Sequence, residues 1–156
     1  MKWSWLSAGV VVAFLAGAAG WYVFGSPTES DVSATTDTAL LRTGERVYAA
    51  NCASCHGRRG QGQEDWRTRK PDGKLPAPPL NGEGHTWHHP DSHLRAVVTK
   101  GVEAMAPAGY ESDMRGFKDK LSEREIRAVI AYLKDWWPAH ARSRQQEITD
   151  RAASSE

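Results

Sequence analysis

The sequence predicts an all-α protein: a small helical domain preceded by an apolar N-terminal helix. Two patterns support this prediction: an uncharged run from Trp3 to Gly25, and an amphipathic helix that begins with the capping box Ser122–Glu125. The 156 residues leave room for one modest domain plus extensions. The 14 glycines and 8 prolines indicate a loop-rich domain with a small core of its own.

The N-terminal run Trp3–Gly25 is long enough, as a helix of roughly 30 Å or slightly more, to cross a bilayer. Its two ends carry the aromatic residues expected at membrane interfaces, namely Trp3, Trp5, Trp21 and Tyr22. A cleaved signal peptide is the alternative, because Ala16–Ala18 offers small residues to a peptidase. Apolar character continues beyond that site, so we favour an anchor over a signal peptide for residues 1–25.

Residues 26–37 are polar and lack apolar periodicity, which predicts a flexible tether. Asp37 is a predicted N-cap for the first helix of a domain that covers residues 38–138. Gly44 lies in the middle of this helix, where glycine costs about 1 kcal/mol relative to alanine. We therefore expect Gly44 to permit the close approach of another helix.

The only two cysteines of the chain form a C-x-x-C-H run, at Cys52, Cys55 and His56. This spacing places the three side chains within one helical turn. Two thiols so placed suit covalent addition to the two vinyl groups of a haem, and the adjacent imidazole can reach the iron from the same side. The motif predicts one covalently attached haem c per chain, with His56 as an axial ligand.

A C-x-x-C pair alone is also typical of redox disulfides and zinc sites. A thioredoxin-like pair needs a preceding strand in a βαβ unit, and no strand-rich stretch precedes Cys52. A zinc site needs about four ligands, and the gap from Cys55 to the next candidate, His85, is far longer than in zinc fingers. Haem attachment is the favoured interpretation.

The loop between Arg58 and Pro79 contains six basic residues against three acidic ones. This excess lies beside the haem motif and predicts a docking surface for an acidic redox partner protein, with an ordinary solvated loop as the alternative. The formal net charge of +1 argues neither for nor against nucleic acid, and we expect no nucleic-acid partner.

Four histidines follow in a short stretch that also contains Trp87 and Pro90; they are His85, His88, His89 and His93. One of them could be a second axial ligand of the iron, or they could form a copper site. Surface positions and local hydrogen bonds are the alternatives.

Further helices are predicted in the C-terminal half. A short helix begins at Asp91 or Ser92 and is stopped by Gly101. The helix capped by Ser122 carries an apolar stripe and ends or kinks at Pro138. Residues 139–156 are polar with mixed charge, which predicts a helical extension or a frayed end without visible chemistry.

The sixth ligand of the iron would determine the chemistry. A thioether raises the reduction potential, a second imidazole lowers it, and a vacant site permits gas binding or peroxide chemistry. Beyond the N-terminal run the candidate methionines are Met105 and Met114. Met114 has the better position, seven residues ahead of Leu121 and the capped helix, and Met105 remains its competitor.

These motifs resemble class I cytochromes c of the bacterial, membrane-associated, single-haem kind, over about Thr38 to Pro138. In that family a glycine and an aromatic residue four positions later precede C-x-x-C-H, as Gly44 and Tyr48 do here. Ala77–Leu80 matches the family's A-P-x-L segment.

The ligand loop of that family, M-P-x-F, is matched by Met114–Phe117, with Arg115 in place of the proline. The resemblance implies a class I cytochrome c-like fold and a haem iron bound by His56 and Met114. It also implies that the Pro78 carbonyl accepts the Nδ1 proton of His56. The missing proline implies a less rigid ligand loop.

We therefore predict a membrane-tethered electron carrier of the bacterial inner membrane, whose haem domain faces the periplasm and exchanges electrons with redox partner proteins. No nucleophile–base pair or acid–base carboxylate pair stands out, so we do not predict an enzyme, although the chain can be the redox subunit of one. The alternatives are a haem sensor or peroxidase-like protein with an open sixth site, and accessory copper binding by the four histidines.

Overall fold

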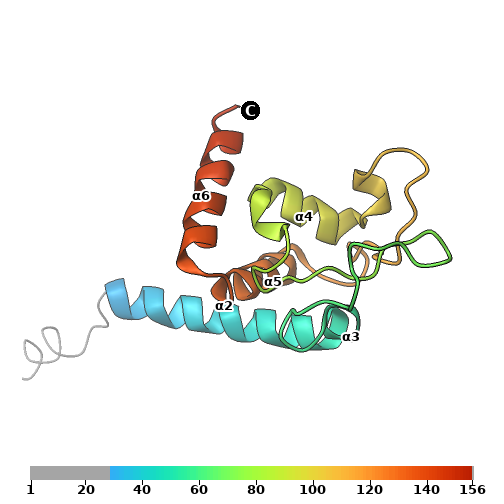
Figure 1. Cartoon of the computed structure of the whole chain (residues 1–156). Coiled ribbons are helices and arrows are strands. Elements are labelled where there is room, and N and C mark those ends of the chain that lie inside the picture. Colours follow the sequence, from blue (N-terminus) through green and yellow to red (C-terminus); the bar gives the residue numbers. More distant parts are fainter. Residues whose placement is uncertain (1–28, 156) are drawn as a thin grey trace, which may run out of the picture. The chain divides into compact units, whose positions relative to one another are not determined.

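A computed structural model describes residues 29–155. Its regular secondary structure over this range is helical, apart from one isolated bridge between Gly101 and Arg115. The elements, in order, are α2 (Glu29–Asn51), α3 (Ala53–His56), the 3-10 helix η1 (Thr86–His88), α4 (Asp91–Lys100), the 3-10 helix η2 (Glu103–Met105), α5 (Glu123–Asp135) and α6 (Ala139–Ala153). Residues 38–156 cluster as one compact unit, and Figure 1 shows α4 beside both α5 and α6 in this unit.

Helix α2 begins well before the position that the sequence indicated. We predicted an N-cap at Asp37 and a tether over residues 26–37, whereas in the structure the helix already starts at Glu29. Extension of an existing helix needs no new nucleation, which explains why a polar segment without apolar periodicity continues it.

The predicted anchor Trp3–Gly25 lies outside the described residues. None of the helices within residues 29–155 is both long and apolar enough to cross a membrane.

Helices α2 and α5 cross at Gly44, which confirms the close approach that we expected from a glycine in the middle of the helix. A Cβ atom on Gly44 would lie 2.6 Å from the Cβ of Tyr132 and still closer to the carbonyl oxygen of Ala128, so only glycine permits this approach. One turn later, the ring of Tyr48 lies 6.0 Å from that of Tyr132 and 5.0 Å from that of Trp136. The crossing fixes the end of α2, from which the cysteine motif follows.

Helix α5 has the predicted capping box: the Ser122 side chain accepts from the Glu125 N–H, and the Glu125 carboxylate accepts from the Ser122 N–H. Its apolar stripe is buried and forms most of the core together with residues of α2 and α4. The core residues of α5 are Ile126, Val129, Ile130 and Leu133, those of α2 are Val47 and Tyr48, and that of α4 is Leu94. Helix α4 ends at Gly101, as predicted.

Helix α6 is the helical extension that we predicted as one of two outcomes for residues 139–156, and it packs on the domain. Ala141 and Gln145 are buried, and the Gln145 amide donates to the carbonyl of His89 at 3.2 Å and the carboxylate of Asp91 at 2.6 Å. Residues that we separated from the domain at Pro138 therefore belong to the same compact unit.

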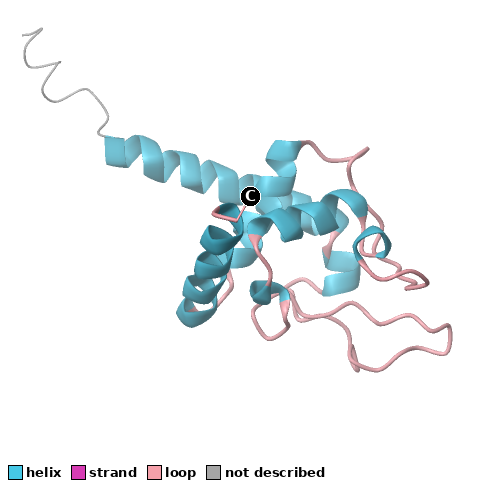
Figure 2. Cartoon of the chain, turned by 90° about the horizontal axis from the view of Figure 1, so that it is seen from above, coloured by secondary structure: helices cyan, strands magenta, loops and turns pink. Residues whose placement is uncertain are grey.

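Long loops connect these helices and lie together on one side of them in Figure 2. The loops carry Pro78 and Met114, the two predicted site residues that lie outside the C-x-x-C-H motif.

Candidate functional site

The C-x-x-C-H motif forms one helical turn that continues from α2. The Cys52 N–H donates to the Tyr48 carbonyl, and the His56 N–H donates to the Cys52 carbonyl, both at 2.9 Å. The two thiols are free, with Cys52 half-buried and Cys55 exposed. Burial, followed by the neighbouring Cys55, raises the pKa of the Cys52 thiol to about 11, so this thiol is protonated at neutral pH in the haem-free chain.

His56 is held in one orientation by the loop that follows it. Its side chain is buried, and its Nδ1 atom lies 2.9 Å from the carbonyl oxygen of Pro78. A carbonyl oxygen can only accept a hydrogen bond, so Nδ1 carries the proton and the Nε2 lone pair is left for a metal. Burial also lowers the pKa of His56, which favours this neutral form.

Two glycines of the loop that follows the motif position the Pro78 carbonyl. Gly60 accepts from the Leu80 N–H at 2.7 Å, and Gly62 donates to the His56 carbonyl at 2.8 Å. A Cβ atom on Gly62 would lie 2.6 Å from the Pro79 nitrogen, and the positive φ of Gly62 favours glycine as well. The spacing Gly60-Gln61-Gly62 is the only sequence signal for this role, and it indicates a turn without revealing which carbonyl the turn supports.

Met114 lies on another loop, which is bonded to the end of α4. Its carbonyl accepts from the Val102 N–H at 3.1 Å, and the Phe117 N–H donates to the Val98 carbonyl at 2.9 Å. These bonds hold the segment although Arg115 replaces the family's proline. Met114 is half-buried, whereas its competitor Met105 lies in η2 with 37% of its surface exposed, which favours Met114 as an iron ligand.

The donor set and its surroundings fit a haem c. Two free thiols and an oriented imidazole occupy one helical turn, and half-buried apolar side chains pack beside the core on the loops and on α4: Leu80, Val98 and Phe117. When bound, haem c supplies an iron that is reversibly oxidised and reduced by one electron. The protein's contribution is to anchor the ring, orient His56 and exclude water from its buried side.

The basic loop between Arg58 and Pro79 is less available for docking than its composition indicated. Lys70 and Lys74 both pair with Asp113, at 2.9 and 2.6 Å. The guanidinium of Arg67 lies over the Trp66 ring at 4.0 Å. Much of the positive charge is therefore engaged within the domain.

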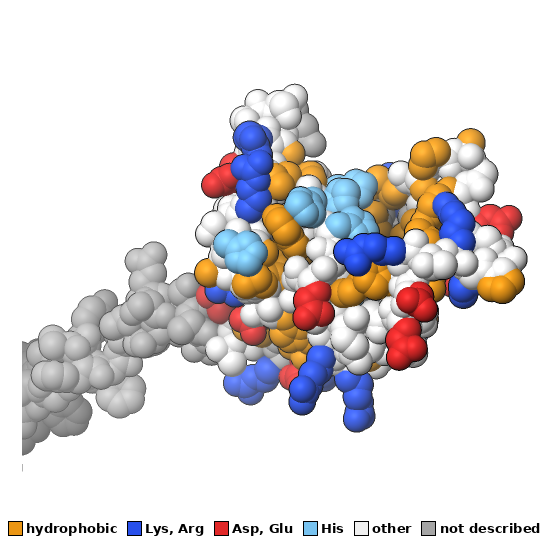
Figure 3. All heavy atoms as spheres, viewed as in Figure 1, with side chains coloured by type: hydrophobic (Ala, Val, Ile, Leu, Met, Phe, Trp, Pro, Cys, Tyr) orange, Lys and Arg blue, Asp and Glu red, His pale blue; other side chains and the backbone are white. Residues whose placement is uncertain are grey.

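The histidines of the Trp- and His-rich segment lie close together, and several pale-blue side chains gather on the face in Figure 3. The His89 ring contacts those of His85 and His93, with centroids 5.6 and 4.4 Å apart, whereas the His88 ring stacks on Trp87 at 3.7 Å. Among the described side chains of residues 37–155, no group of three His, Cys, Asp or Glu is placed to hold a metal ion.

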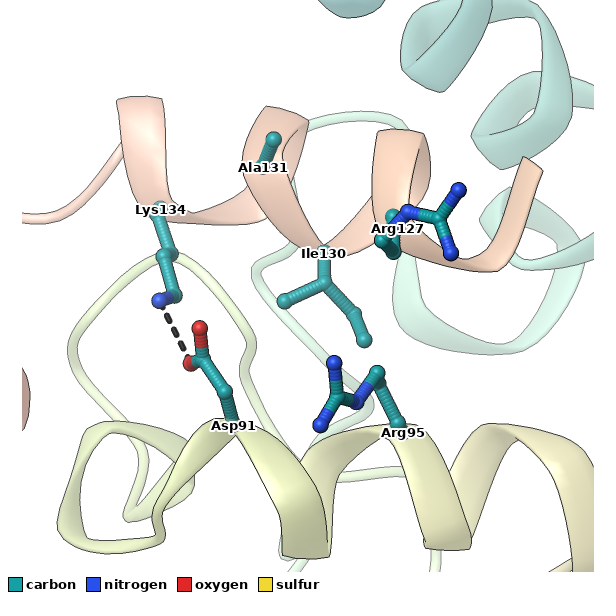
Figure 4. Close-up of a pocket in the computed structure, with 6 residues that line it drawn as sticks. All are labelled: Asp91, Arg95, Arg127, Ile130, Ala131 and Lys134. Atoms are coloured by element: carbon teal, nitrogen blue, oxygen red, sulfur yellow. Dashed lines mark ion pairs between the residues drawn. The ribbon is translucent and has the colours of Figure 1, made fainter. Parts of the chain in front are cut away.

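A pocket lies between α4 and α5 and is separate from the cysteine motif (Figure 4). Asp91 pairs with Lys134 across it at 2.5 Å, and the remaining lining residues are Arg95, Arg127, Ile130 and Ala131. Because Asp91 also accepts from Gln145, this pocket marks the place where α4, α5 and α6 are joined.

The chain matches the family model described as cytochrome c oxidase, cbb3-type, subunit III, over residues 39–133. This range contains the C-x-x-C-H motif, Pro78, Met114 and nearly all of α5. No solved structure matches the chain significantly.

Curated relatives include three redox proteins. One of the subunits of nicotinate dehydrogenase from Pseudomonas putida is 36% identical over 96 residues, which is 60% of this chain and 7% of the relative. The cbb3-type cytochrome c oxidase subunit FixP of Azorhizobium caulinodans is 26% identical over 58% of this chain and 27% of its own length. The cbb3-type cytochrome c oxidase subunit CcoP of Rhodobacter capsulatus is 29% identical over 62% of this chain and 29% of its own length. The chain thus spans less than a third of the length of each of these relatives.

The family match covers the helical turn with its two thiols, the oriented imidazole and the methionine loop. The chain belongs to the cbb3-type cytochrome c oxidase subunit III family and is an electron-transferring cytochrome c domain with covalently attached haem c.

Proposed function

We propose that this chain is a membrane-tethered, periplasmic electron carrier whose haem iron is bound by His56 and Met114. The observation that carries the assignment of His56 is its hydrogen bond from Nδ1 to the Pro78 carbonyl, at 2.9 Å. This bond leaves Nε2 available and would strengthen the imidazole as a donor to the haem iron. With His56 and Met114 as its protein ligands, the haem iron would gain and lose one electron with little rearrangement of the residues that hold it.

Met114 is the better sixth ligand on two grounds. Met114 is half-buried and its carbonyl accepts a hydrogen bond from the Val102 N–H, whereas Met105 is exposed. Phe117, three residues after Met114, is a half-buried apolar side chain that can pack against a haem.

Residues 1–25 are proposed to anchor the domain to the inner membrane, with the haem domain in the periplasm. The support is the length of the uncharged run Trp3–Gly25 and the aromatic residues at its ends. The partners are proposed to be redox proteins, because the named relatives are subunits of an oxidase and of a dehydrogenase. The membrane proposal is tested by fractionation and by sequencing of the mature N-terminus. A soluble protein that starts near Ala19 would contradict it.

The ligand proposal is tested on the ferric protein by the near-infrared charge-transfer band of a thioether–iron bond. Met114→Ala should abolish the band and allow carbon monoxide to bind the ferrous haem, whereas the matched variant Met105→Ala should do neither. The reverse pattern would assign the ligand to Met105. A wild-type protein without the band and with an open site would support a sensor or a peroxidase-like protein instead.

A further inference from the structure

Asp113, the residue beside Met114, is held by two lysines from a distant loop. One carboxylate oxygen of Asp113 lies 2.9 Å from Nζ of Lys70, and the other lies 2.6 Å from Nζ of Lys74. The loop residues are about forty positions earlier in the chain. Two cations on the two oxygens of one carboxylate restrain its position more strongly than a single pair does.

A second contact joins the same two segments. The guanidinium of Arg69 lies 5.3 Å from the centre of the Tyr110 ring, within the range of a cation–π interaction. The loop is itself closed at this point, because the Lys70 N–H donates to the Lys74 carbonyl at 2.9 Å. Lys70 and Lys74 therefore come from one hairpin-like turn and act on Asp113 together.

The two sides of Met114 are held in different ways. On its C-terminal side, backbone hydrogen bonds from Phe117 and Lys118 to α4 fix the chain. On its N-terminal side, the Ser112 hydroxyl accepts from the Met114 N–H at 3.1 Å, which is a local contact within the same segment. The Ser112 N–H also donates to the Glu103 carboxylate of η2 at 2.9 Å. The ion pairs of Asp113, together with the contact between Arg69 and Tyr110, connect this side to the loop carrying Pro78.

We propose that Asp113 is a positioning residue, and that its ion pairs with Lys70 and Lys74 hold Met114 on the haem iron. This inference rests on the proposed ligation by Met114. We call the two ion pairs of Asp113 with Lys70 and Lys74 the clamp. It restrains the methionine loop, as the proline after the methionine does in the family, where this chain has Arg115. It also links the two ligand loops, so that the Pro78 side and the Met114 side of the haem move as one.

The clamp is exposed, which determines how it responds to salt. The side chains of Lys70, Lys74 and Asp113 are 37%, 29% and 55% exposed. Ion pairs with this exposure are modest in strength and are screened as ionic strength rises. We therefore expect Met114 to leave the iron about two to five times more often when the clamp is removed.

The experiment uses full-length ferric holoprotein and imidazole as the entering ligand. At saturating imidazole, the observed rate equals the rate at which the methionine leaves the iron. In the wild type this rate should rise with ionic strength. In Asp113→Asn it should be about two- to fivefold higher at low salt and should no longer depend on salt.

Three variants separate positioning from a general structural effect. Lys70→Gln combined with Lys74→Gln should reproduce Asp113→Asn, and Asp113→Glu should restore most of the wild-type rate. Asp119→Asn removes the same charge from an exposed position of the same segment and should leave the rate and its salt dependence unchanged. Equal rates and equal salt dependence in the wild type and Asp113→Asn, with the thioether band present in both, would overturn the clamp alone. A wild type without the band would overturn the Met114 ligation and the clamp together.

Discussion

Where α2 crosses α5, the helices are joined by packed aromatic side chains, whereas the loops that carry Pro78 and Met114 are held by individual hydrogen bonds and ion pairs. At the crossing, the aromatic rings of Tyr48, Tyr132 and Trp136 lie within 6.0 Å of one another. In the loops, the equivalent connections are individual backbone hydrogen bonds, such as that from Leu80 to Gly60. The crossing therefore provides stability, and the loops provide ligand geometry.

This difference matters for an electron carrier. Packed helices resist change because many contacts must be lost at once. A loop held by a few hydrogen bonds can move by local changes that leave the core intact. Substitutions at the crossing should therefore change the free energy of unfolding, and substitutions in the loops should change the properties of the iron.

The largest effect is expected at the crossing itself. Gly44→Val would place side-chain atoms against the backbone of Ala128, which cannot yield locally, and should lower the free energy of unfolding by about 3 kcal/mol. Urea unfolding of the holoprotein measures this change. Ala49→Val, at an exposed position on the same helix, introduces the same side chain and should cost much less. Equal losses in the two variants would contradict the close-approach explanation.

A smaller loss is expected where α6 joins the core. Gln145→Ala would remove the side-chain donor to the His89 carbonyl and one of the two donors to Asp91 Oδ1, which still pairs with Lys134, and should cost about 2 kcal/mol. Gln146→Ala is the matched control, because Gln146 is exposed and bonds only to Asp150 within α6. If thermal unfolding does not distinguish the two variants, α6 is not an integral part of the domain.

In the loops, the expected effect is mainly on the reduction potential. Gly62→Ala would push a methyl group against the Pro78–Pro79 backbone and weaken the hydrogen bond to His56. A less basic imidazole stabilises ferric iron less, so the potential should rise. Gly73→Ala imposes a similar positive φ on alanine in open space, and should leave the potential unchanged. A spectroelectrochemical titration that gave both variants the same potential would contradict the role assigned to Gly62.

The two regions also differ in how well the sequence predicted them. The Ser122 capping box, the Gly101 stop and the Gly44 crossing follow from a capping motif and from two glycines, and the structure confirms all three. The contact between His56 and Pro78 followed from a family motif, because nothing in the spacing itself joins residues 22 positions apart.

Three other features of the structure had weak signals in the sequence. The buried residues of α6 are Ala141 and Gln145. Neither of them is strongly apolar, and the strongly apolar Trp137 lies before the helix begins, so the segment resembled a solvated extension. The pairing of Lys70 and Lys74 with Asp113 joins distant loops, which composition cannot reveal. We therefore predicted from the composition that these two lysines belong to a basic docking surface. The early start of α2 was missed because a polar helix has no periodicity to reveal it.

The most direct test of the central claim, iron ligation by His56 and Met114, is a proton–carbon NMR spectrum of the ferrous protein with labelled methionine methyl groups. The chain contains three methionines, Met1, Met105 and Met114. A methyl group bound to the iron lies over the porphyrin, whose ring current shifts its signal far upfield. We predict one such signal, which disappears in Met114→Leu and persists in Met105→Leu. A shifted signal that disappears in Met105→Leu, or a wild-type spectrum without any shifted methionine methyl, would contradict the account.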